Sequence, residues 1–129
     1  MLKKTIKYTD YNGNERSDIL YFNLTKAEII EMEAGITGGL SEQITKIIEA
    51  KDVPSIIKIF KDLILKAYGE KSQDGKRFMK NDDLRTAFSE TEAYSNLFVE
   101  LATDADAATA FVNGIMPQIQ SIKSINAQS

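Results

Sequence analysis

The chain has 129 residues, of which 43% are hydrophobic and 27% charged, with a net charge of -3. This length and composition fit one soluble globular domain, and so small a net charge is not typical of a nucleic-acid binder. The chain contains no cysteine and no histidine, which excludes disulfides and thiolate chemistry and removes the commonest general base and transition-metal ligand. The first residues have charges where a signal peptide would be apolar, and no apolar stretch is long enough to span a membrane. Composition therefore favours an interaction domain without cofactors over an enzyme.

Residues 3–24 predict a β-hairpin. The pair Asn12-Gly13, flanked by alternating segments, is typical of a two-residue type I′ turn. With these two residues at the centre of the turn, the pairing sets Ile6 opposite Ile19.

The same turn has a second interpretation, a calcium-binding loop. Asp10, Asn12 and Asn14 have the spacing of the first three ligands of such a loop. The loop would also need Gly at position 15 and Glu at position 21, where this chain has Glu15 and Tyr21. We therefore expect a hairpin here and no metal site.

The second strand of this hairpin is apolar on both faces. Ile19 and Tyr21 share one face, and Leu20, Phe22 and Leu24 share the other. Because a hairpin alone is marginally stable in water, one face must pack on helices. The other face, or the strand edge, is expected to meet another chain, either a second copy or a partner protein.

After the hairpin, apolar residues recur at the spacing that is typical of α-helices. Thr25 and Glu28 form a capping box for the first helix, and Ser41 is the expected cap of a second helix after the glycine-rich break at 35–39. Residues 54–68 are apolar on more than one side of a helix and are expected to form the central helix. Further helix starts are predicted at Asn81, Thr91 and the segment 103–106.

These elements together predict an α+β, mainly α protein: an N-terminal β-hairpin followed by a compact bundle of about five or six helices over residues 25–116. Residues 69–81 are expected to be a polar loop that turns at Asp74-Gly75. Residues 1–117 are expected to form a single globular domain, with 118–129 as a flexible C-terminal tail.

Charge is distributed unevenly along the chain. Residues 81–104 contain six acidic side chains and one arginine, whereas residues 52–80 contain seven basic and four acidic side chains. Asp82, Asp83, Glu92 and Asp104 fall at predicted helix starts, where the helix dipole favours negative charge, so we interpret them as helix-end acids rather than a catalytic or metal cluster. The basic segment lacks interleaved aromatic residues, so we expect no nucleic-acid site there. The two segments could instead attract one another, within the fold or between copies.

Six segments of the chain carry a resemblance to a known family: Tyr21 to Ile29, Gly38-Gly39-Leu40, Ile56 to Lys61, Ala67 to Ser72, Thr91 to Tyr94 and Glu100 to Asp104. From about residue 1 to residue 117, the chain resembles the tail assembly chaperones of long-tailed (siphovirus-type) bacteriophages. The resemblance implies a small helix-rich protein, encoded by a phage or prophage, that acts in the cytoplasm of the host bacterium. It also implies binding to the tape-measure protein, recruitment of the tail-tube protein and absence from the mature virion.

The candidate protein-binding residues are Ile19, Tyr21, Ile59 and Leu65, because these apolar side chains fit least well on the inward faces of their elements. The alternative for each of them is an ordinary place in the core. An alternative function is a structural tail or connector protein that is retained in the virion. Self-association is possible under either function, and neither one needs an enzymatic activity or contact with a membrane.

Overall fold

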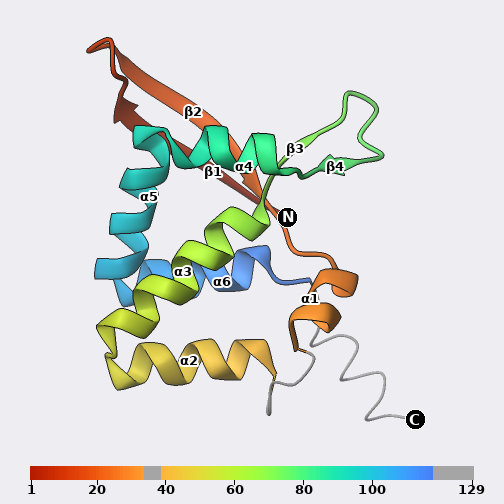
Figure 1. The fold of residues 1–129 in the computed structure, drawn as a ribbon, viewed down its shortest axis with the longest axis vertical. Helices are drawn as coiled ribbons and strands as arrows, with labels where there is room; N and C mark the ends of the chain where they lie inside the picture. The colour runs from red at the N-terminus through yellow and green to blue at the C-terminus, as the bar shows by residue number, and fades with distance from the viewer. Residues whose placement is uncertain (34–38, 118–129) are drawn as a thin grey trace.

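The computed structural model describes residues 1–33 and 39–117, which form four strands and six helices. An N-terminal strand pair, β1 (Leu2–Thr9) and β2 (Glu15–Phe22), precedes the helices (Figure 1). The predicted fold class, α+β and mainly α, is confirmed. The predicted C-terminal tail, residues 118–129, lies outside the described residues.

The predicted hairpin forms, but its predicted register is wrong by one residue. Ile6 pairs with Asp18, and Ile19 pairs with Thr5. The loop has three residues instead of two, because the backbone N–H of Asp10 donates to the carbonyl of Asn14 at 2.8 Å.

The side chain of Asp10 explains this longer turn. Its Oδ1 accepts from the backbone N–H groups of Asn12 and Asn14, both at 2.9 Å, and its Oδ2 accepts from Nε of Arg16 at 2.6 Å. Only Gly13 then needs a positive φ, which is 82°. These contacts also hold the pKa of Asp10 below its usual value, with the Arg16 hydrogen bond as the largest cause. Asp10 therefore stabilises the turn from within, and no calcium ion is needed to explain its position.

A second strand pair occupies the segment that was predicted to be a polar loop. β3 (Tyr68–Lys71) pairs with β2 and with β4 (Phe78–Met79), which gives a four-stranded sheet of order β1-β2-β3-β4. The expectation that residues 69–81 are a loop is therefore wrong where β3 and β4 form, although the predicted turn at Asp74-Gly75 is present. β3 begins directly after a helix and takes its hydrogen-bond partners from β2, through the pairs Tyr21 with Gly69 and Phe22 with Tyr68. Glycine and charged residues are poor strand formers, so pairing with β2 and β4 explains why this segment is extended.

The six helices are α1 (Lys26–Glu33), α2 (Leu40–Ala50), α3 (Val53–Ala67), α4 (Asp82–Ser89), α5 (Glu92–Thr103) and α6 (Ala105–Ile115). Their predicted caps are largely confirmed: the side chains of Thr25, Asn81, Thr91 and Asp104 each accept a backbone N–H from the first turn. Ser41 is not a cap, because α2 begins one residue earlier. The N-terminal N–H of Leu40 instead donates to Oε1 of Glu33 at 2.9 Å, so the end of α1 caps the start of α2.

The core lies between the inner face of the sheet and the helices. α3 passes through the middle of the molecule, with α2 below it and α4 and α5 beside it (Figure 1). The predicted central role of this helix is confirmed, since Phe60, Leu63, Ile64 and Ala67 are completely buried. On the sheet, Ile6 and Phe22 are buried against the helices, so the inner face of the hairpin is core.

Gly69 is required by the close approach of β4. A Cβ atom at this position would lie 2.7 Å from the ring of Phe78 and 2.8 Å from the carbonyl oxygen of Met79. Because the carbonyl belongs to the paired strand, the two strands would have to separate. We expect Gly69→Ala to lower the free energy of unfolding by about 1–3 kcal/mol, measured by urea denaturation.

Gly114→Ala is the matched control for that substitution. Its Cβ would lie 2.8 Å from Cδ1 of Leu2, the flexible end of a side chain that can move. Gly114 is in α6, where alanine gains about 1 kcal/mol of helix propensity. Equal losses of stability in the two variants would contradict the role given to Gly69.

Candidate functional site

The four candidate protein-binding residues lie on two separate surfaces. Ile59 and Leu65 are half-buried on α3 and line the same pocket. Ile19 and Tyr21 lie on β2, where Ile19 is 51% exposed and Tyr21 is half-buried. The structure thus brings the candidates together in pairs rather than in one patch.

The pocket on α3, which we call the α3 groove, has a volume of about 520 Å³ and an apolar floor. Three helices contribute apolar side chains to this floor. These are Met32 of α1, Leu40 of α2, and Ile59, Leu63 and Leu65 of α3. Leu40 and Leu63 are buried in the core, whereas Met32 and Ile59 are only partly covered. Three helices therefore supply one open apolar surface.

Charged side chains form the rim of the α3 groove. Arg85 of α4 is fixed there, because its Nε donates to the carbonyl of Leu65 at 3.2 Å and its guanidinium lies 3.5 Å from Asp82. Lys66 and Asp62 line the same rim, and among the described residues neither of them makes an ion pair. A groove with an apolar floor and charges of both signs on its rim can hold an amphipathic helix.

The second surface, which we call the outer sheet face, is the side of the sheet turned away from the helices. The observed register places on it Lys3, Thr5, Lys7 and Thr9 of β1, Glu15, Ser17, Ile19 and Tyr21 of β2, Lys71 of β3 and Phe78 of β4. All of these side chains are exposed or half-buried. The ammonium of Lys71 lies 4.5 Å from the centroid of the Tyr21 ring, so a cation–π contact joins β3 to β2.

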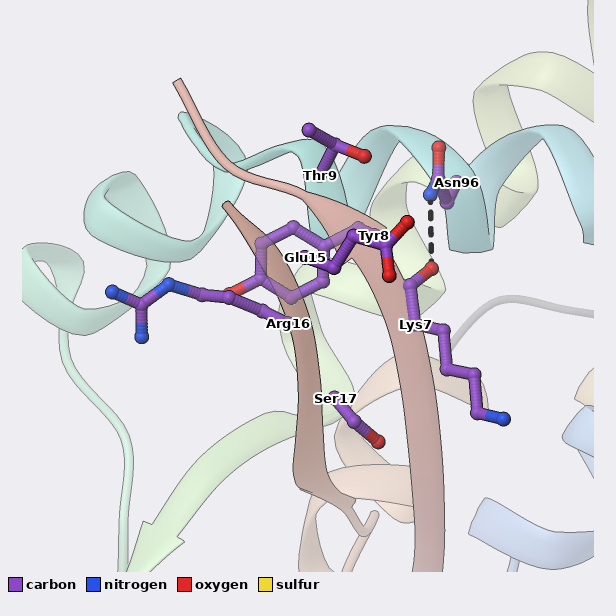
Figure 2. Close-up of a pocket in the computed structure, with 7 residues that line it drawn as sticks. All are labelled: Lys7, Tyr8, Thr9, Glu15, Arg16, Ser17 and Asn96. Atoms are coloured by element: carbon purple, nitrogen blue, oxygen red, sulfur yellow. Dashed lines mark hydrogen bonds between the residues drawn. The ribbon is translucent and has the colours of Figure 1, made fainter. Parts of the chain in front are cut away.

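A pocket of about 600 Å³ lies at the turn end of the hairpin, beside α5 (Figure 2). Its lining is mostly polar, and Figure 2 shows the amide of Asn96 donating to the carbonyl of Lys7, at 3.2 Å. The hydroxyl of Tyr8 donates to Asp18, and this hydrogen bond raises the pKa of Tyr8 above its usual value. Asn96 and Tyr8 thus each have a hydrogen-bond partner within the protein, and the hollow continues the outer sheet face at Lys7 and Ser17.

Four acidic residues of the segment 81–104 lie at helix starts, as the sequence predicts. Asp82 and Asp83 are in the first turn of α4, Glu92 is in the first turn of α5, and Asp104 caps α6. Within the described residues, no group of three or more His, Cys, Asp or Glu side chains is arranged to hold a metal ion. Over the same residues, no helix is long and apolar enough to cross a membrane.

Comparison with known proteins points to the same family as the sequence resemblance. A family model described as "Phage tail assembly chaperone" matches residues 1–128. The chain belongs to this family. No curated protein and no solved structure matches the chain. Family membership gives the chain a chaperone role in phage tail assembly.

Sequence reasoning found only part of each surface of this tail assembly chaperone. Ile59 and Leu65 were chosen because they fall off the main apolar stripe of α3, and both line the α3 groove. Met32, Leu40 and Arg85 were missed, because their contribution depends on how α1, α2 and α4 pack around α3. Phe78 was missed because β4 was not predicted at all.

Proposed function

We propose that this chain binds the tape-measure protein of its phage through the α3 groove, in the cytoplasm of the host bacterium. In this proposal it keeps the tape measure soluble until the tail-tube protein assembles around it, and it does not enter the mature virion. The observation that supports the proposal is the open apolar floor of the α3 groove, to which three helices contribute. The chain's family gives the general role, and the groove offers a place where it could be performed.

The geometry of the α3 groove fits one kind of client. A long helical protein that has not yet been enclosed by a tube has apolar stripes exposed to water. Helix-in-groove binding covers such a stripe with apolar side chains and orients it by charges on the rim. Burying one isoleucine side chain contributes about 1.5–3 kcal/mol, so each contact is modest, and a long client would need many copies of the chaperone.

We expect Ile59→Gln to weaken binding to the co-expressed tape-measure protein about tenfold or more. The substitution removes a buried isoleucine contact worth about 1.5–3 kcal/mol, and about 1.4 kcal/mol corresponds to each factor of ten in affinity. Ile57→Gln is the matched control, since Ile57 is on the same helix, is 44% exposed and does not line the groove. Binding would be measured by titrating purified chaperone into a fluorescently labelled tape-measure fragment, with thermal unfolding of both variants as a check. Equal binding by the two variants would remove the α3 groove from the proposal.

The composition of purified virions separates this function from that of a structural tail or connector protein. A chaperone that leaves before maturation should be missing from virions and present in lysates of infected cells. A fixed number of copies in every virion would favour the structural function instead.

A further inference from the structure

We propose that copies of this chain associate head to tail, with the outer sheet face of one copy against the exposed surface of α4 on the next. This inference goes beyond the proposed binding of a client, since it concerns a different surface. It rests on the unpaired charges of the two surfaces and on their positions on opposite sides of the sheet.

The outer sheet face carries an excess of positive charge around an apolar centre. Lys3, Lys7 and Lys71 lie on it with Glu15 as the one acidic side chain, although the whole chain has a net charge of -3. Ile19 is 51% exposed at the centre of this face. Among the described residues, none of the three lysines makes an ion pair. The face is thus suited to an acidic protein surface that can also cover an isoleucine.

The exposed surface of α4 is complementary in charge. Asp82 and Asp83 of α4, and Glu90 directly after its last residue, are all exposed, and the Asp82 side chain is 99% accessible even though it lies near Arg85. Asp83 and Glu90 make no ion pair with any described residue. The small side chain of Ala87, exposed on the same helix, leaves room for an apolar side chain between the acids.

These two surfaces cannot meet within one chain. Phe88 of α4 stacks on Tyr68 with ring centroids 4.1 Å apart and contacts Phe22 edge-on at 5.9 Å. Phe22 and Tyr68 lie on the inner face of the sheet, so α4 covers that face and its acids point away from it. The lysines are on the far side of the strands. Complementary surfaces on opposite sides of one molecule favour a contact between copies.

Such a contact is heterologous, because it joins two different surfaces. After two copies have met, one outer sheet face and one α4 surface remain free, so a third copy can add. The arrangement would give a row of chaperones rather than a closed dimer.

Two charge-reversal variants test this arrangement. The basic-face variant carries Lys3→Glu and Lys71→Glu, and the acidic-face variant carries Asp83→Lys and Glu90→Lys. By sedimentation velocity at low salt, we expect the unmodified chain to form species larger than a dimer as its concentration rises, and each variant alone to associate at least tenfold more weakly. A mixture of the two variants should associate again, because the unchanged surface of each is complementary to the unchanged surface of the other and the two reversed surfaces also have opposite charges.

The controls separate electrostatic association from misfolding. Lys58→Glu reverses an exposed charge on α3, away from both surfaces, and should associate like the unmodified chain. If the basic-face variant loses its thermal transition, Lys3→Gln with Lys71→Gln replaces it, and the same weakening is expected. High salt should dissociate the unmodified chain.

Three results would overturn the proposal. A monomer at every concentration at low salt would exclude self-association while leaving the proposed binding to the tape measure untouched. Variants that associate like the unmodified chain would exclude these surfaces. A mixture that stays monomeric although each variant alone has lost association would exclude the head-to-tail pairing of the two faces.

Discussion

Replacing Phe22 with alanine should lower the free energy of unfolding by about 3–5 kcal/mol, the usual cost of removing a fully buried phenylalanine side chain. Phe22 has no exposed surface, and its ring lies 5.9 Å from that of Tyr68 and 5.4 Å from that of Phe111. Its ring therefore joins β2 to β3, to α4 through Phe88 and to α6. Its removal would leave a cavity where four elements meet, and the measurement is urea denaturation followed by circular dichroism.

The control for this loss is Ile19→Ala on the same strand. Ile19 is 51% exposed on the outer sheet face, so its truncation should change the free energy of unfolding by less than about 1 kcal/mol in the monomer. A loss at Phe22 no larger than the loss at Ile19 would contradict the inner and outer faces assigned to β2.

Replacing Lys80 with alanine should lower the free energy of unfolding by about 2–3 kcal/mol, because it leaves a partly buried carboxylate without its partner. The Lys80 ammonium lies 2.8 Å and 2.9 Å from the two oxygens of Glu28 and donates to the carbonyl of Asn23 at 2.6 Å. The two side chains are only 11% and 23% exposed, so solvent screens this pair less than a surface pair. Lys80 thereby fastens the end of the β3–β4 hairpin to the start of α1.

The acid dependence of stability gives this prediction a second measurement. Burial alone would raise the pKa of Glu28, but the hydrogen bonds from Lys80 and from the backbone of Thr25 outweigh it and lower the pKa below its ordinary value of 4.5. A carboxylate with a depressed folded pKa contributes stability above its unfolded pKa and loses it as the pH falls through the folded value. The stability difference between the unmodified chain and Lys80→Ala should therefore be largest near neutral pH and shrink below about pH 4.

Lys66→Ala is the control for the Lys80 substitution. Lys66 lies near Lys80, is half-buried and makes no ion pair with a described residue, so its truncation should cost less than about 1 kcal/mol and show no such acid dependence. Burial lowers the pKa of Lys80, and the pairing with Glu28 opposes that shift only in part. A constant difference between the unmodified chain and Lys80→Ala across the acid range would contradict a charged Glu28–Lys80 pair.

Features that depend on a few neighbouring residues could be predicted from the sequence. The capping box of Thr25 and Glu28 and the caps at Asn81, Thr91 and Asp104 each join groups within three residues of one another. The hairpin register could not be predicted from Asn12-Gly13 alone, because the Asp10 side chain competes for the same turn.

Features that depend on distant segments were missed or found only in part. β3 is extended because β2 offers an edge, and no local pattern in Gly69 to Lys71 shows this. Only part of the α3 groove could be predicted, because the rest of its lining comes from helices that are distant in the sequence. Ile59 and Leu65 are conspicuous on their own helix, whereas Met32 and Arg85 join them only after the helices have packed.

The direct passage from α3 into β3 has a consequence for how the chain folds. The β1–β2 hairpin needs only local contacts and can form in microseconds, but the pair Phe22 with Tyr68 closes a loop that contains α1, α2 and α3. The second edge of β2 therefore stays unpaired until α3 has been synthesised and has brought Tyr68 to it. During translation Phe22 therefore stays uncovered at least until Tyr68 has been synthesised at the end of α3, and β4, α4 and α6 follow only afterwards.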